Sequence, residues 1–141
     1  MLISSRGRYA LLVMIDLAGH RGGLVPGRQI AERLELSQKY LERILRTLAE
    51  AGLIEGSHGK GGGYRLCRAP EEYSVREILE VTEGDLAPVA CLKDDAVPCE
   101  TADRCRTISM WRELYKTLNN FFDSYTVADL LPGGDNGSWI I

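Results

Sequence analysis

The sequence contains no hydrophobic run long enough to span a membrane, which takes about 20 consecutive apolar residues. Residues 9–15 are apolar, but Asp16 interrupts them and no small-residue cleavage site follows. A secretory signal peptide is therefore not expected either. We expect a cytoplasmic protein that does not contact a membrane and whose thiols stay reduced.

Histidine is scarce, and the two that are present, His20 and His58, lie in glycine-rich turns. Neither stands near a nucleophile or a carboxylate at the spacing of a catalytic motif, so an enzyme is not expected. The glycine-rich segment 56–63 lacks the Walker and dinucleotide-binding patterns, because no helix follows it in register. Nucleotide binding by this segment is therefore not expected.

Charge is unevenly distributed along the 141 residues, whose net charge is −3. Residues 1–70 hold eleven Lys and Arg against six Asp and Glu, a balance of +5. Residues 71–141 hold six against fourteen, a balance of −8. The amino-terminal half suits a polyanion, which would repel the carboxy-terminal half. A chain of this length forms one domain, or one domain with an appendage, and needs no disulfide for a stable core.

Three helices are predicted in the amino-terminal half. The first covers residues 5–19 and has a broad apolar face: Tyr9, Leu12, Val13, Ile15 and Leu17. Pro26 suits the first position of a short second helix with the inner face Ile30, Ala31 and Leu34. Ser37 is a good N-cap for a third helix, which runs to about Glu50 and stops before Gly52.

The third helix has two distinct faces. Apolar residues recur on one of them at helical spacing: Tyr40, Leu41, Ile44, Leu45 and Leu48. The other face carries Gln38, Lys39, Glu42, Arg43 and Arg46. Two short helices joined by a tight turn, the second with cations on its outer face, are typical of a helix-turn-helix. An ordinary solvated helix face would look the same in isolation, but the segment that follows weakens that alternative.

A basic hairpin is predicted next, because strand-like runs at 53–55 and 64–66 flank the glycine-rich segment 56–63. Glycines allow close backbone approach, so backbone amides and Lys60 can meet phosphates or enter a groove. A merely flexible turn would need fewer glycines. This order of elements predicts a mainly α, winged helix-turn-helix domain over residues 1–84 that binds double-stranded DNA. The expected DNA contacts are Arg28, Ser37, Gln38, Lys39, Tyr40, Arg43, His58, Gly59 and Lys60.

Two further helices are predicted in the carboxy-terminal half. Ser74 caps one over residues 75–83, which Gly84 ends. From Thr107 a long helix carries an apolar and aromatic stripe: Ile108, Trp111, Leu114 or Tyr115, Leu118, Phe121 or Phe122, and Tyr125. Operators read by helix-turn-helix proteins are typically two-fold sites, so we expect a homodimer through residues 107–131. Packing of this helix against its own domain is the alternative, and residues 132–141 are expected to form a disordered tail.

Three cysteines, Cys91, Cys99 and Cys105, lie in the irregular segment 85–106 with the spacing C-x7-C-x5-C. Thiolates are soft ligands that suit zinc, copper(I) or iron–sulfur clusters. Short zinc knuckles are absent, and wide spacings within one loop fit an iron–sulfur cluster at least as well as zinc. The alternatives are an idle set of thiols, or a disulfide pair with a spare cysteine. Cys67, at the end of the second hairpin strand, is expected to be buried and is left out of the metal site.

Several short motifs together resemble the family of IscR-type regulators, which includes NsrR and CymR. They are Ser5-Arg6-Gly7-Arg8-Tyr9-Ala10, Tyr40-Leu41-Glu42, Gly59-Lys60-Gly61-Gly62-Gly63-Tyr64, the three cysteines and Trp111. The resemblance covers about residues 1–131 and implies a homodimeric transcription factor whose operator binding depends on cluster occupancy. The three cysteines would then ligate a 2Fe–2S cluster, as in the IscR branch, or a 4Fe–4S cluster, as in the NsrR branch; the former is favoured.

The sequence departs from both branches at the fourth cluster ligand. IscR-type members place a histidine where this chain has Ile108, and the NsrR pattern takes an aspartate where it has Arg8. The fourth ligand stays open among Asp94, Asp95, Glu100, Asp103, Glu42 and a small external thiol. CymR-like members work without a cluster, but they lack the three cysteines.

The expected function is that of a transcriptional repressor that senses cluster status, redox stress or nitric oxide. The alternative is a cluster-free winged-helix repressor controlled by a protein partner. An electron-transfer or cluster-carrier protein is a third hypothesis, which the basic hairpin does not favour.

Overall fold

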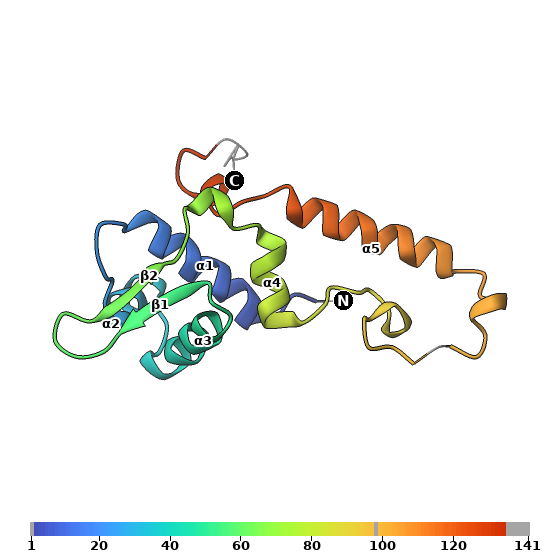
Figure 1. Ribbon diagram of the computed structural model, residues 1–141, viewed down its shortest axis with the longest axis horizontal. Coiled ribbons are helices and arrows are strands. Elements are labelled where there is room, and N and C mark those ends of the chain that lie inside the picture. Colours follow the sequence, from blue (N-terminus) through green and yellow to red (C-terminus); the bar gives the residue numbers. More distant parts are fainter. Residues whose placement is uncertain (1, 98, 135–141) are drawn as a thin grey trace.

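The computed structural model describes residues 2–97 and 99–134, which form a small winged domain with a long helix and a loop extending from it (Figure 1). Within these ranges, no helix is long and apolar enough to cross a membrane. Most of the tail predicted over residues 132–141 lies outside the described residues.

Three helices open the chain close to the predicted positions: α1 (Ser5–Gly19), α2 (Gly27–Leu34) and α3 (Gln38–Glu50). The predicted cap of α3 is confirmed, because the hydroxyl of Ser37 accepts a hydrogen bond from the backbone N–H of Tyr40 at 3.1 Å. Pro26 precedes α2 as its N-cap in an extended conformation, so the predicted start was one residue early.

The wing is an antiparallel hairpin of β1 (Ile54–Ser57) and β2 (Gly63–Leu66). Val25, just before α2, adds a bridge to Tyr64 through two backbone hydrogen bonds of 2.8 and 2.9 Å. A Cβ atom on Gly63 would lie 2.5 Å from the carbonyl oxygen of Val25, so glycine permits this close approach. The hairpin is thereby joined to the helix-turn-helix, and the predicted winged helix-turn-helix is confirmed.

The chain leaves the winged domain after α4 (Val75–Glu83), which packs against α1. The cysteine segment, residues 85–106, follows and contains the short 3-10 turns η2 (Ala90–Leu92) and η3 (Ala102–Arg104). Helix α5 (Ile108–Asp123) then runs back toward α4 (Figure 1). After α5 come the fully buried Val127, which belongs to the core of the winged domain, and the short 3-10 turn η4 (Ala128–Leu130).

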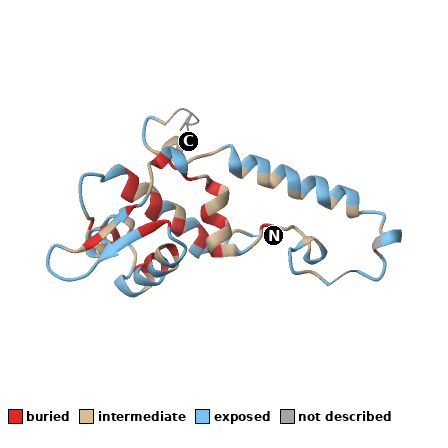
Figure 2. Ribbon diagram, viewed as in Figure 1, coloured by how far each residue is buried: buried red, intermediate tan, exposed pale blue. Residues whose placement is uncertain are grey.

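The core lies between α1, α2, α3, α4 and the hairpin (Figure 2). Its fully buried side chains include Ala10, Val13, Met14, Ile30, Leu41, Ile44, Leu45 and Leu48. Successive helix residues are about 100° apart, so Leu12, two residues from both Ala10 and Met14, points the other way and is 42% exposed. Its predicted place on the inner face was wrong.

Cys67 is exposed, and its predicted burial was also wrong. Side chains alternate along a strand, and Leu66, the last residue of β2, points into the core. The residue after it therefore faces outward.

Helix α5 has two different apolar sides, although none of its residues is buried within the described part of the chain. Tyr115 and Phe122 pack against Val75 and Leu79 of α4. Met110, Leu114 and Phe121 are 53%, 38% and 56% exposed. Of the predicted pairs, Tyr115 and Phe122 are therefore the inner members, and Leu114 and Phe121 are the outer ones.

Candidate nucleic-acid interface and cysteine segment

The turn between α2 and α3 determines how the recognition helix is presented. Glu35 ends α2 in the left-handed conformation, with φ 54° and ψ 43°. The next helix then buries Leu41, Ile44, Leu45 and Leu48 against the core. Its remaining side chains must face solvent, and Gln38, Lys39, Glu42, Arg43 and Arg46 are indeed exposed.

The eleven cations of residues 1–70 fall into two groups. The side chains of six arginines donate hydrogen bonds to other residues of the chain: Arg6, Arg8, Arg21, Arg33, Arg65 and Arg68. Arg33, for example, forms two 2.8 Å hydrogen bonds with Asp16 and so ties α2 to α1. Within the described residues, the side chains of Arg28, Lys39, Arg43, Arg46 and Lys60 have no such partner. These five unpaired cations all lie on the helix-turn-helix or at the wing tip, where they can meet an anionic partner.

The start of α3 forms a shallow cavity of about 240 Å³, lined by Ser37, Lys39, Tyr40 and Arg43. Tyr40 is only half exposed, because its ring meets that of Tyr9 edge to face. The predicted contact residues Ser37, Lys39, Tyr40 and Arg43 therefore share one surface, whereas the exposed side chain of Gln38 donates to Glu42 at 3.4 Å. Tyr40 also has a packing role there.

The other predicted contacts lie close by or at the wing. Arg28 is exposed in the first turn of α2. His58, Gly59 and Lys60 are exposed at the hairpin tip, where Gly59 has φ 93° and its carbonyl accepts a hydrogen bond from Gly62 at 3.0 Å. The tight glycine turn thus presents Lys60 outward without bulky neighbours.

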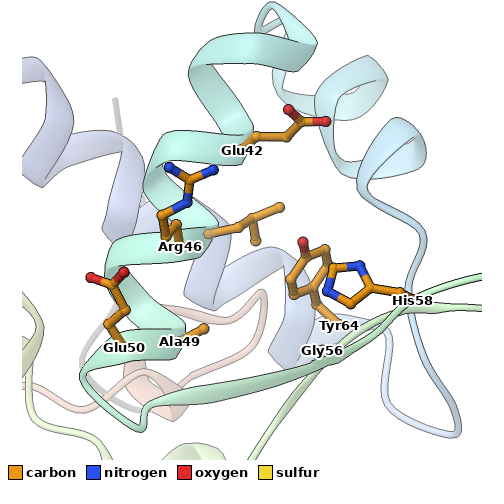
Figure 3. A pocket seen from close by; sticks show the side chains of 8 residues that line it. Glu42, Arg46, Ala49, Glu50, Gly56, His58 and Tyr64 are labelled. Atoms are coloured by element: carbon orange, nitrogen blue, oxygen red, sulfur yellow. The ribbon is translucent and has the colours of Figure 1, made fainter.

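A cavity of about 510 Å³ separates the recognition helix from the wing (Figure 3). Helix α3 contributes Glu42, Leu45, Arg46, Ala49 and Glu50, and the hairpin contributes Gly56, His58 and Tyr64. Leu45, Ala49 and the Tyr64 ring contribute apolar surface to its lining, and the other side chains contribute charged and polar groups. Of these residues, only His58 is among the predicted contacts.

The cysteine segment exposes its thiols. Cys91 lies in η2 and is exposed, as is Cys99, whereas Cys105 is half buried. The sulfur of Cys99 is 3.2 Å from the hydroxyl of Thr101, and that of Cys105 is 3.6 Å from the hydroxyl of Thr107. These hydrogen bonds lower the pKa of both thiols, for Cys105 with a smaller contribution from the charge of Arg112. Both sites therefore favour the thiolate, the form that ligates metal.

The donor set fits a thiolate-ligated cluster in its chemistry. Cys99 and Cys105 are close enough for the charge of one to oppose ionisation of the other. However, the described residues contain no group of three Cys, His, Asp or Glu side chains arranged to hold a metal ion. Cys91 is thus not gathered with the other two thiols.

The two family positions for a fourth ligand hold residues with other roles. Ile108 is the first residue of α5 and is half buried, and Arg8 donates to the hydroxyl of Ser5 at 3.1 Å. Glu42 lines the cavity beside the wing, whereas Asp94 is in the cysteine segment, where its backbone N–H donates to Asp85 at 3.2 Å.

Known proteins resemble this chain over nearly its whole length. The profile of the Rrf2 family, described as an iron-dependent transcriptional regulator, matches residues 3–133. The chain belongs to the Rrf2 family. The transcriptional regulator IscR of Aliivibrio salmonicida is 34% identical over 132 residues, which are 93% of this chain and 77% of that protein.

Two solved structures extend this likeness to the fold. CymR, the global cysteine regulator of B. subtilis, superposes with a TM-score of 0.76 and 34% identity, covering 96% of this chain and 99% of that one. IscR of T. potens superposes with a TM-score of 0.70 and 34% identity, covering 92% and 85%. This Rrf2 chain is therefore an IscR-like transcriptional regulator and not an enzyme.

Two residues that line the α3–wing cavity of this Rrf2 chain, Arg46 and Tyr64, were not among the predicted contacts. Arg46 was placed on the outer face of α3, and that position was the available signal. Tyr64 was assigned only to a strand. Its position in the fold depends on the bridge to Val25, which joins two residues far apart in the sequence.

Proposed function

We propose that this Rrf2 regulator is a repressor that senses cluster status, redox stress or nitric oxide through an iron–sulfur cluster in its cysteine segment. One observation carries the proposal. Among the described residues, the unpaired cations of the winged domain all lie on the helix-turn-helix and the wing, and this domain continues directly into a segment with three exposed or half-exposed cysteines.

The exposed start of α3 would contact the bases of DNA, and the wing would contact the flanking backbone or groove. Lys39, Arg43, Gln38, Ser37 and Tyr40 would enter the major groove, and Arg28, His58, Gly59 and Lys60 would contact the flanking backbone or groove. A helix-turn-helix reads base edges from the N-terminal part of its second helix, which is where Ser37 to Arg43 lie.

Cys91, Cys99 and Cys105 would hold the cluster, with 2Fe–2S favoured and the fourth ligand open. When bound, an iron–sulfur cluster supplies redox-active iron that oxygen and nitric oxide can reach. Thr101 and Thr107 support the site by hydrogen bonds to two of the sulfurs, which favour their thiolate forms.

The chain's own contacts offer a route from the cysteine segment to the DNA surface. The segment begins at the end of α4, where Glu83 accepts hydrogen bonds from the backbone and side chain of Ser4. Arg6 donates to the carbonyl of Thr82 at 2.7 Å. The start of α1 is thus tied to the end of α4, and Tyr9 on α1 contacts Tyr40 at the start of α3.

A homodimer is part of the same proposal. Met110, Leu114 and Phe121 leave the outer side of α5 apolar and exposed, and a second copy could cover it. Leu114→Glu would bury an unpaired charge in that interface, at a cost of several kcal/mol. The Leu114→Glu variant should therefore sediment as a monomer, whereas the Lys116→Glu variant should sediment as a dimer. Wild-type protein that sediments as a monomer at micromolar concentration would contradict the homodimer.

The experiment that tests the cluster is anaerobic purification followed by iron and sulfide assays and an absorption spectrum. Wild-type protein should contain iron and sulfide and absorb visible light. Cys99→Ala should lose all three properties, and Cys67→Ala, which removes an exposed thiol outside the segment, should keep them. Unchanged iron, sulfide and spectrum in Cys99→Ala would contradict the site.

A cluster-free repressor controlled by a protein partner is the second candidate. It is favoured by the described residues' lack of a three-ligand group and by the structural likeness to CymR. Wild-type protein that contains no iron or sulfide after anaerobic preparation would support the cluster-free repressor over the cluster-sensing one.

A further inference from the structure

The cavity between α3 and the wing lies between the two elements that would contact DNA, yet part of its lining is apolar. Its lining includes the apolar Leu45, Ala49 and Tyr64 ring. Arg46 and His58 stand on opposite sides, one on the helix and the other on the hairpin (Figure 3). A sugar–phosphate backbone has matching chemistry, because its deoxyribose is partly apolar and its phosphate is anionic.

Tyr64 is held in place by its ring. A Cβ atom on Gly56 would lie 2.8 Å from this ring, and one on Gly27 would lie 3.8 Å from it. The ring is therefore packed between the wing and the start of α2. Its hydroxyl has no hydrogen-bond partner within the described ranges, so that it is free to donate into the cavity.

Arg46 is the one unpaired cation of the winged domain outside the predicted contact set, as far as the described residues show. It is exposed on α3, one turn beyond Glu42, and lines the cavity. An arginine without a carboxylate partner can donate a charge-assisted hydrogen bond to phosphate.

Two carboxylates also line the cavity and would oppose an anion. Glu42 accepts a hydrogen bond from the side chain of Gln38 at 3.4 Å, at the end of the cavity near the start of α3. Glu50 is exposed at the other end of the helix. These carboxylates repel an anion, so removing the charge of one of them should strengthen phosphate binding. That increase in affinity is a second test of the site.

We propose that this cavity holds a backbone phosphate of duplex DNA, bound by the guanidinium of Arg46 and the hydroxyl of Tyr64. The inference rests on DNA binding in the proposed function. A phosphate contact is independent of sequence, so no operator is needed to test it.

The experiment measures binding of the full chain to a mixed-sequence DNA duplex as salt rises from about 50 to 200 mM. Arg46→Ala should weaken binding by about tenfold, as expected for a charged hydrogen bond, and should reduce the slope of log K against log salt by about 0.9. Tyr64→Phe keeps the packed ring and removes only a neutral donor. It should weaken binding by about fivefold with an unchanged slope.

Two charge controls separate the cavity from net charge. Lys116→Ala removes an exposed cation of α5 and should leave affinity unchanged. Glu50→Gln should strengthen binding more than Glu71→Gln, which changes net charge equally but lies outside the cavity.

The proposal is overturned if Arg46→Ala keeps the wild-type slope or if Tyr64→Phe keeps the wild-type affinity. A wild-type chain that binds no duplex would overturn the DNA-binding function as well. Binding by the wild type and weakened binding by Lys60→Ala, with Arg46→Ala and Tyr64→Phe unaffected, would overturn the cavity site alone.

Discussion

The ring of Tyr9 meets the ring of Tyr40 edge to face, with centroids 6.0 Å apart and an interplanar angle of 87°. Tyr9 belongs to α1 and Tyr40 to the first turns of α3, so this pair fixes the recognition helix on the core. Both residues lie in motifs that carry the family resemblance, and their contact gives those motifs a shared physical role.

The Tyr9–Tyr40 pair should couple energetically. Edge-to-face aromatic pairs contribute about 0.5–1.5 kcal/mol beyond their buried area. In urea denaturation, Tyr9→Leu and Tyr40→Leu should therefore show a coupling energy of that size in a double-mutant cycle. Tyr9→Leu combined with Tyr125→Leu, a tyrosine in another cluster, should be additive. Additive losses for the first pair would contradict this role.

The left-handed backbone at Glu35 should be strained, and glycine at this position should relieve the strain. Glu35 is the one non-glycine residue with positive φ in the described part of the chain. The left-handed conformation costs a side-chain-bearing residue about 1–2 kcal/mol, so Glu35→Gly should raise the free energy of unfolding by up to about 1 kcal/mol. Glu32→Gly, inside α2, should lower it by about 1 kcal/mol. Equal losses for both variants in denaturant titrations would count against the strain.

Lys60 and Arg43 should differ in how they affect DNA binding. Lys60 at the wing tip is assigned to phosphate, so Lys60→Ala should weaken all sequences alike and reduce the salt slope by about one. Arg43 on α3 is assigned to base edges, so Arg43→Ala should relax specificity by about 1–3 kcal/mol at one base pair. Fluorescence anisotropy with operator and mutated duplexes measures both effects. Unchanged affinity in both variants would refute these contacts.

Thr101 should control the reactivity of Cys99 in cluster-free protein. Its hydrogen bond is the main cause of the lowered pKa of Cys99. A lowered pKa keeps the thiolate populated to lower pH, and Thr101→Val should therefore move the pH midpoint of Cys99 alkylation upward. Peptide mass spectrometry after iodoacetamide treatment at stepped pH measures this shift. Thr117→Val, whose hydroxyl bonds a helix carbonyl, should leave the midpoint in place, and the same midpoint in all three proteins would disprove the effect.

Most of the fold can be predicted from local signals in the sequence. Ser37, Ser74 and Gly84 marked helix ends correctly, because capping depends on neighbouring residues alone. Exposure was harder to predict. Leu12 lies on a helix with apolar residues on several sides, so periodicity did not single out its inner face.

The cysteine segment shows a different limit. The sequence located three thiols, but not how far apart they lie, because an irregular loop has no repeating geometry from which to place side chains. The same holds for Tyr64, whose place opposite Arg46 follows from a long-range bridge. Several predicted contact residues thus share one surface at the start of α3, whereas their contact with DNA and the metal site stay predictions.

Control of DNA binding by the cluster can be measured as a difference in operator affinity between protein with and without iron. An operator is first selected from a random duplex library under anaerobic conditions, and its affinity is then measured for iron-loaded and chelator-treated protein. We predict a difference on the order of 5–150-fold, the usual range of allosteric coupling, which Cys99→Ala should abolish. Equal affinities for the iron-loaded and iron-free wild-type protein would contradict control of DNA binding by the cluster.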